Sequence, residues 1–177
     1  MTDKPIVVPY VPYDPEWPGR FEAERAVLEL VLAPWLKGGI HHIGSTALPG
    51  IAAKPTIDMV AGVRDLDEAR AAFDPLRELC YEYAFHRPGT HRFYKPQSPS
   101  LATHHLHLTE PGSDLWRERL AFRDALRTDP ALAAEYQALK LRLVEEERRG
   151  GAEYTAAAKR PFVARVLASA GIQLRPR

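Results

Sequence analysis

The chain has one cysteine, no long apolar run and almost no net charge in its 177 residues. With Cys80 alone, an intramolecular disulfide and a cysteine-based zinc site are excluded, and we expect this residue to be a small apolar side chain closing a helix. The first residues lack the apolar core of a signal peptide, and no segment is apolar over the length of a membrane span, which predicts a cytoplasmic protein with no membrane partner. The net charge of +1 argues against a general nucleic-acid coat protein.

Hydrophobic residues make up 45% and charged residues 27% of the chain, which is ordinary for a globular protein, and the length predicts one domain over residues 1–177. Apolar periodicity and turn residues predict an α+β fold in which helices cover a sheet and a helical tail follows. Pro75 predicts a kink or an early break in the second helix. The predicted helices span 15–36, 65–79, 113–128, 130–149 and 153–170, and the predicted strands span 40–43, 56–60, 81–86, 91–95 and 101–109.

Residues 41–60, HHIGSTALPGIAAKPTIDMV, contain the most informative pattern in the chain. Gly44-Ser45-Thr46 follows a short apolar strand, so these residues are expected to form a tight turn whose backbone N–H groups and hydroxyls suit a phosphate or another anion. Asp58 lies in the alternating strand 56–60, where a buried carboxylate needs a partner. A metal ion or a cationic group of a substrate would serve as that partner.

A second pattern is His105-Leu106-His107 in the strand predicted over 101–109. Strand alternation places His105 and His107 on one face, with His104 on the other face beside the leucines. Two imidazoles about 7 Å apart can approach one metal ion or one phosphate. Two partly buried histidines satisfied by local hydrogen bonds would produce the same pattern.

Three cations near these patterns are candidates for an anion-binding pocket. Lys54 lies in the loop between the turn and Asp58. Arg92 and Lys95 lie on the predicted strand 91–95, where the alternation of side chains places them on opposite faces. Only one of these two is therefore expected to reach a given pocket, and the other is expected to be an ordinary surface charge.

The GST turn and an aspartate thirteen residues after Ser45 resemble the signature of the nucleotidyltransferase fold, a Gly-Ser turn followed by a strand with Asp-x-Asp or Asp-x-Glu. The longer string HIGSTALPGIAAKPTIDMV resembles the GrpB family within that superfamily. Three later stretches support the same resemblance, so that it covers nearly the whole chain. They are HHLHL at 104–108, FRDALRTDPALAAEYQALK at 122–140 and YTAAAKRPF at 154–162.

The resemblance implies a nucleotidyltransferase-like mixed β-sheet and a nucleotide or phosphorylated metabolite as the small-molecule partner. It suggests that Asp58, His105 and His107 are the catalytic and metal-binding residues. The residues that it implies for substrate binding are His42, Gly44, Ser45, Thr46, Lys54, Arg92, Lys95, Arg123, Lys140 and Lys159. Attachment of the helical tail to the sheet would explain Arg123, Lys140 and Lys159 equally well.

One position departs from the superfamily pattern, because Val60 stands where the second acid is expected. Two-metal phosphoryl transfer depends on carboxylates, and losing one weakens a magnesium site, whereas histidine ligands favour zinc or manganese.

Two main hypotheses about function follow. One is a metal-dependent nucleotidyltransferase using Mg²⁺, Mn²⁺ or Zn²⁺. The other is a non-catalytic nucleotide- or phosphometabolite-binding module linked to coenzyme A metabolism, because some family members are fused to dephospho-CoA kinase. A hydrolase using the histidine pair is a third reading, without a nucleophile motif to support it.

Overall fold

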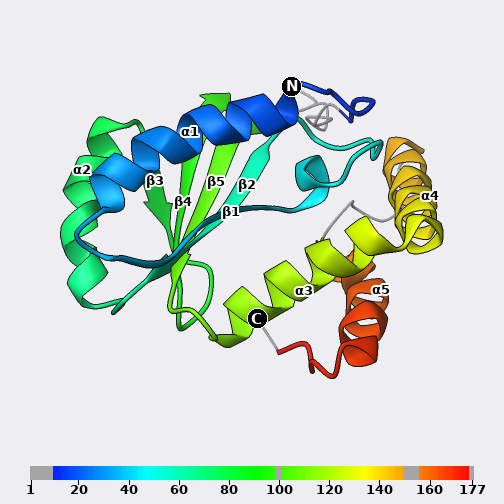
Figure 1. Cartoon of the computed structure of the whole chain (residues 1–177). Coiled ribbons are helices and arrows are strands. Elements are labelled where there is room, and N and C mark those ends of the chain that lie inside the picture. The colour runs from blue at the N-terminus through cyan, green and yellow to red at the C-terminus, as the bar shows by residue number, and fades with distance from the viewer. Residues whose placement is uncertain (1–9, 99–100, 150–155, 176–177) are drawn as a thin grey trace.

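A computed structural model describes residues 10–98, 101–149 and 156–175. In these residues a five-stranded mixed sheet is combined with helices at both faces (Figure 1). The strands are β1 (Leu36–Ile43), β2 (Ile57–Val63), β3 (Glu82–Ala84), β4 (His91–Ser98) and β5 (Leu101–Thr109). The helices are α1 (Trp17–Leu32), η1 (Ser45–Ala47), η2 (Glu68–Ala72), α2 (Phe73–Glu78), α3 (Asp114–Thr128), α4 (Pro130–Arg148) and α5 (Ala156–Ser169).

The strand order in the sheet is β1-β2-β5-β4-β3. β2 and β5 run parallel at its centre, and the other neighbouring pairs are antiparallel. Because β2 and β5 are parallel and in register, Asp58 lies directly opposite His105. The central pairing therefore joins the two patterns that the sequence singles out, although some 45 residues separate them along the chain.

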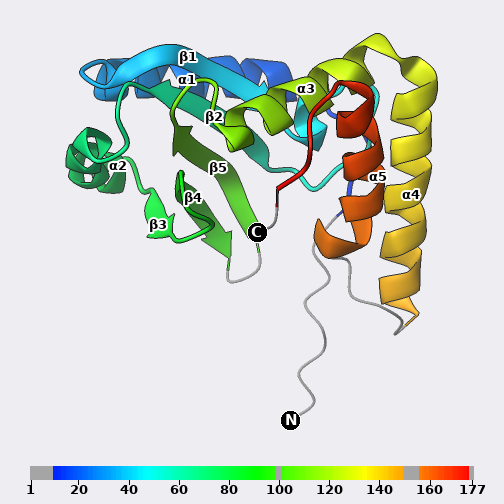
Figure 2. The ribbon, with the colours of Figure 1, turned by 90° about the horizontal axis from the view of Figure 1, so that it is seen from below.

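The two faces of the sheet are covered differently (Figures 1 and 2). On one face, α1 and α2 pack on the apolar side chains of the strands, including Met59, Phe93 and Leu106, to form the largest core cluster. Since neighbouring residues of a strand point to opposite faces, Asp58, Arg92 and His105 point to the other face. This second face carries the candidate site.

The helical tail covers only part of that second face. Leu115 of α3 packs against Ile43 of β1 and Val60 of β2 in a small apolar cluster. α4 and α5 then pack beside α3, with Tyr136 and Phe162 in an apolar cluster of their own (Figure 2). The remaining space between the tail and the strands is where the cavities described below lie.

Two local predictions need correction, the start of β1 and the environment of Cys80. β1 begins at Leu36 rather than at residue 40, because the strand continues through Gly38 and Gly39 with a register shift. A side chain at Gly38 would lie 2.8 Å from both Pro111 and Trp116, so glycine permits this close packing. The helix predicted over 65–79 is divided into η2 and α2, consistent with the break that Pro75 predicts.

Cys80 does follow the last turn of α2, but it is exposed and has a left-handed backbone with φ of 65°. Residues 153–155 of the last predicted helix lie outside the described residues. In the described part of the chain, no helix combines the length and the apolar character needed to cross a membrane.

Candidate functional site

A cavity of about 340 Å³ opens on the second face of the sheet, where β2, β5 and β4 meet the tail. It brings together several residues that are far apart in the sequence, with both predicted patterns represented. The residues that line it are Ile43, Gly44, Asp58, His86, Arg92, His105, His107, Arg119 and Lys159.

At the centre of this cavity, Asp58 and His105 form a hydrogen-bonded pair. His105 Nδ1 donates to Asp58 Oδ1 over 2.8 Å, and both side chains remain about 30% exposed (29% and 31%). Burial opposes ionisation of the carboxyl group. The hydrogen bond and charge of His105, with the charge of Arg119, outweigh burial and hold the pKa of Asp58 below its ordinary value. Asp58 is therefore a carboxylate, which orients the His105 ring toward the cavity.

The turn before η1 is shaped to fit against this carboxylate. Gly44 has φ of 72°, a left-handed conformation that favours glycine. A Cβ atom at this position would lie 2.5 Å from Asp58 Oδ2, so any side chain would displace the carboxylate. Gly44 therefore allows the turn backbone to border the cavity at Asp58.

His42 and Thr46 support the turn from behind rather than facing the cavity. Thr46 Oγ1 donates to the backbone oxygen of Thr56 over 3.0 Å and lies 2.9 Å from His42 Nε2. Because the hydroxyl proton is already used, Nε2 is the donor in this contact. Burial, aided by Arg127 and Arg123 and opposed by Asp58, lowers the pKa of His42 to about 4.

Lys140 from α4 supports the same turn and is fully buried. Its Nζ donates to Ser45 Oγ over 3.1 Å and to the backbone oxygen of Ala52 over 2.8 Å. Nζ also lies 4.7 Å from the centroid of the Tyr136 ring. Burial and the nearby Lys159 lower the pKa of Lys140 to about 7. Lys140 thus reaches the predicted turn, where it contacts Ser45 rather than the cavity.

His107 presents an unsatisfied ring nitrogen at this site. The side chain lines the cavity yet is only 6% exposed, and Nδ1 has no hydrogen-bond partner among the described residues. Burial first, and then the nearby charges led by Arg119, lower the pKa of His107 well below its ordinary value, so the ring is neutral. A buried nitrogen without a partner is rare and costly, and a ligand in the cavity would satisfy it.

Cations dominate the charge around this cavity. Arg92, Arg119 and Lys159 line it, whereas Asp58 is its one acidic lining residue in the described part of the chain. Arg92 Nη2 lies 3.5 Å from His105 Nε2, so the cation extends over the Asp58–His105 pair. Arg92 and Lys159, which were predicted to bind the substrate, are thus both among the residues that line this cavity.

His86 and Arg119 are absent from the sequence predictions. His86 lies just before the turn at 87–90, and its ring is 5.3 Å from that of His107. Arg119 lies in the middle of α3, in a helix rich in exposed charges. Neither position carries a local motif, and only the packing of α3 against the sheet reveals Arg119.

A larger cavity of about 450 Å³ adjoins the first and shares Gly44, His86, Arg119 and Lys159 with it. The residues found only in the larger cavity are mostly apolar or mutually paired. They are Arg87, Glu118, Phe122, Tyr136, Ala157, Arg160, Val163 and Leu174. The shared residues make the two cavities compartments of one cleft.

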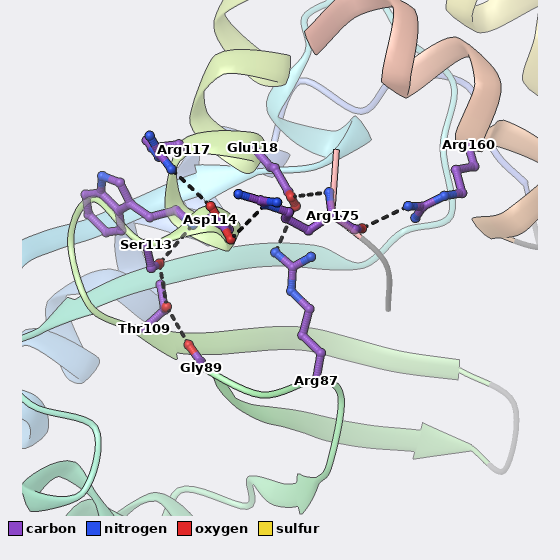
Figure 3. A network of polar contacts seen from close by, with 10 residues as sticks. Arg87, Gly89, Thr109, Ser113, Asp114, Arg117, Glu118, Arg160 and Arg175 are labelled. Carbon is purple, nitrogen blue, oxygen red and sulfur yellow. Dashed lines mark hydrogen bonds and ion pairs between the residues drawn. The ribbon is translucent and has the colours of Figure 1, made fainter. Parts of the chain in front are cut away.

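A polar network fixes one wall of the larger cavity (Figure 3). Arg87 and Glu118 form a buried ion pair of 2.8 Å, and the backbone N–H of Arg175 donates to Glu118 Oε1 over 3.0 Å. Arg160 donates to the backbone oxygen of Arg175 over 2.9 Å, and the Arg175 side chain pairs with Asp114 at 3.3 Å. These contacts hold the segment after α5 across the end of the cleft, where Leu174 lines the cavity.

The structure does not bring every predicted residue to the cleft. Lys95 points to the opposite face, where its Nζ lies 2.6 Å from Glu24, so we leave it out of the site. Arg123 pairs with Asp124 and donates to the backbone oxygen of His42 over 3.1 Å, which attaches α3 to β1. Lys54 is partly buried in the loop before β2 and does not line either compartment.

The donor set does not fit a metal ion held by the protein alone. Within the described residues, no group of three or more His, Cys, Asp or Glu side chains is arranged to hold a metal. The ring nitrogen of His105 that does not contact Asp58, Nε2, lies 3.5 Å from the Arg92 guanidinium, and three cations line the same cavity. Val60, at the position of the missing acid, is fully buried beneath Leu115. The arrangement suits an anion better than a resident divalent cation.

Comparisons with solved structures define the class of fold. The chain is similar to a cytoplasmic RNA terminal U-transferase, with a TM-score of 0.51, 13% identity, and coverage of 73% of this chain and 40% of that one. It is more similar to the conserved protein GrpB from Enterococcus faecalis, with a TM-score of 0.78, 29% identity, and coverage of 92% and 96%. The fold is therefore nucleotidyltransferase-like, as predicted.

Sequence comparisons place the chain within this class. The family model described as GrpB protein matches residues 7–169, and the chain belongs to the GrpB family. Glutamate-rich protein GrpB of Alkalihalophilus pseudofirmus is 34% identical, with coverage of 89% of this chain and 92% of the relative. UPF0157 protein YqkA of Bacillus subtilis is 35% identical over 76% of this chain, which spans only 39% of that protein. A dephospho-CoA kinase of Mycolicibacterium paratuberculosis is 32% identical over 86% of this chain, which spans 43% of that protein.

Proposed function

We propose that this protein binds a nucleotide or another phosphorylated metabolite, with the phosphate in the compartment at Asp58. The observation that carries the proposal is the excess of cations around a cavity with one carboxylate. Arg92, Arg119 and Lys159 supply charge for a phosphate, and guanidinium groups match its oxygens geometrically. His107 Nδ1 supplies a further hydrogen-bonding atom that has no described protein partner.

A thermal-shift screen of nucleotides and coenzyme A precursors tests this proposal. A true ligand should raise the melting temperature increasingly with its concentration, because it binds the native state only. Each compound is measured with EDTA and with Mg²⁺, Mn²⁺ or Zn²⁺. Since the protein donors do not fit a resident metal, we expect binding to persist in EDTA, and a strict requirement for metal would contradict that expectation.

Replacing Arg92 by Gln should weaken the binding of the identified ligand by roughly tenfold, because one charge-assisted hydrogen bond to phosphate is lost. The matched control is Arg117→Gln on α3, an exposed arginine paired with Asp114 outside the cleft. Isothermal titration calorimetry of both variants gives the comparison. Equal affinities in the two variants would remove Arg92 from the site.

Nucleotidyl transfer is a second candidate function, favoured by the position of the Gly44-Ser45 turn beside Asp58 in this fold. The Asp58→Asn variant separates transfer from binding. If Asp58 takes part in transfer, turnover is lost; if the pocket only binds, removing the one carboxylate leaves phosphate affinity unchanged or raised. The dephospho-CoA kinase relative makes dephospho-CoA and its precursors suitable first substrates. A cytoplasmic location of the protein also remains part of the proposal.

A further inference from the structure

We infer that the larger compartment of the cleft receives an uncharged, flat apolar body attached to the phosphate, so that the ligand is a phosphate ester of an aromatic or similarly apolar group. The inference rests on the proposed function, because the phosphate must occupy the neighbouring compartment. The two compartments share Gly44, His86, Arg119 and Lys159, so one molecule can extend from one into the other.

The charges that line only the larger compartment are already satisfied. Arg87 and Glu118 pair with each other at 2.8 Å, with side chains 9% and 6% exposed. Arg160 donates to the backbone oxygen of Arg175 (Figure 3). An incoming charged group would have to break these contacts, and an uncharged group would not. This compartment therefore differs in kind from the one at Asp58.

Most of the other residues that line only the larger compartment are apolar. Phe122, Val163 and Leu174 come from α3, α5 and the segment after α5, and they converge on one cavity. Phe122 packs edge-on against Tyr136, with ring centroids 5.3 Å apart, so its position is fixed by other aromatic side chains. A volume of about 450 Å³ lies within the usual range of small-molecule pockets, which are mainly apolar with a few polar groups.

The test compares two probes, inorganic phosphate and phenyl phosphate, by isothermal titration calorimetry on the full chain. Both carry the same kind of anion, and only the second has an apolar ring. We expect phenyl phosphate to bind at least tenfold more tightly, because burying a ring in an apolar wall adds affinity in proportion to the buried area.

Two variants locate the effect. Val163→Trp should fill the larger compartment and reduce the advantage of phenyl phosphate by about tenfold, while the affinity for inorganic phosphate stays within twofold. Leu30→Trp adds the same ring to α1 at a site where the native leucine is 81% exposed, and it should change neither affinity. Phe122→Ala is a second way to remove part of the wall, should the tryptophan variant fail to fold.

The outcomes separate this inference from the proposed function. Equal affinity for the two probes, or a phenyl advantage that survives in both wall variants, would overturn the inference and leave phosphate binding standing. If neither probe binds, while Arg92→Gln and the wild type behave identically, the proposed function fails and the inference fails with it. Tighter binding of phenyl phosphate that is lost only in the wall variants supports both.

Discussion

Two polar clusters lie on opposite faces of the same strands, and they differ in how their charges are balanced. On the face beneath α1, Glu24 pairs with Lys95 at 2.6 Å, accepts from the Tyr81 hydroxyl at 2.9 Å, and lies 3.8 Å from His104. On the other face, Asp58 pairs with His105 while Arg92, Arg119 and Lys159 line the same cavity. Lys95 and Arg92 are three residues apart on β4, yet they belong to different clusters.

This difference distinguishes a structural cluster from a candidate site. Around Glu24 each cation or donor faces one carboxylate, and the side chains of Glu24, Lys95 and His104 are at most 20% exposed. Burial and Glu24 raise the pKa of Tyr81, so the hydroxyl stays protonated and continues to donate. Around Asp58 the cations outnumber the acid and border a cavity. This arrangement of cations beside an open volume is the basis of the proposal that the cavity binds an anion.

The largest expected effect concerns Lys140, a buried cation with no carboxylate within ion-pair distance among the described residues. Its pKa is lowered to about 7, so the folded state releases a proton that the unfolded state holds up to about pH 10.5. Stability should therefore rise from pH 7 to pH 10.5, by on the order of 5 kcal/mol from this group. Urea denaturation of the wild type and Lys140→Met across this pH range measures the difference.

In Lys140→Met the contribution of this group to the rise should disappear, so the stability difference between variant and wild type changes steadily with pH. Lys37→Met, which removes an exposed lysine from β1, is the matched control and should follow the wild-type curve. A pH-independent difference between wild type and Lys140→Met would show that the buried amine keeps its proton throughout. That result would contradict the expectation that a buried cation without a carboxylate partner lowers the stability of the folded state, of which Lys140 is the clearest example.

The next largest effect concerns the cluster around Glu24, in which each cation or donor contacts the same carboxylate. Glu24→Gln removes the one carboxylate among the described residues that pairs with Lys95 and His104. It should lower the free energy of unfolding by about 3 kcal/mol, because it leaves a largely buried cation without its partner. Glu22→Gln, on the same helix but 54% exposed, should change stability by less than about 0.5 kcal/mol. Urea denaturation at pH 7 measures both, and phosphate affinity should be unchanged in both.

If Glu24→Gln instead weakened ligand binding without affecting stability, the assignment of the two clusters would be reversed. Its effect on unfolding and its lack of effect on binding are thus both needed. Arg92→Gln is expected to show the opposite pattern, with weaker binding and little loss of stability.

The sequence was sufficient to predict the faces of the strands but not their pairing. Alternation placed His105 with His107 and His104 opposite, and separated Arg92 from Lys95, as the structure has them. Alternation is a local property with a period of two residues, so it can be derived from the sequence. The parallel pairing of β2 with β5 connects distant segments and was not predicted. The resemblance to a known family implied only that Asp58 and the two histidines share a site.

The residues that line the candidate site were predicted where a motif marks them and missed where only packing brings them there. Gly44 and Asp58 belong to a recognisable string, whereas Arg119 is one charge among many on an amphipathic helix. His42 and Lys140 belong to matching stretches too, yet they stabilise the turn from behind. A motif therefore identifies which residues belong together, but it does not say which of them face the ligand.

The smallest effect concerns the contact between the turn and Asp58, and two glycines allow a matched measurement. Gly44 and Gly50 have nearly the same φ, 72° and 75°, but a Cβ at Gly50 would meet no atom within 4 Å. Gly50→Ala should therefore cost about 1 kcal/mol from the left-handed backbone alone. Gly44→Ala should cost about 1 kcal/mol more, because the new methyl group displaces the Asp58 carboxylate.

Binding should distinguish the two glycine variants more clearly than stability does. A displaced Asp58 no longer holds His105 in place, so Gly44→Ala should alter the affinity for inorganic phosphate, while Gly50→Ala should leave it unchanged. Calorimetric titration of both variants checks this expectation. Identical affinities, together with equal losses of stability, would mean that the Asp58–His105 pair does not depend on the turn. The cluster around Asp58 would then be held in place by the strands alone. It would differ in this respect from the cluster around Glu24, which is held by the strands and α1.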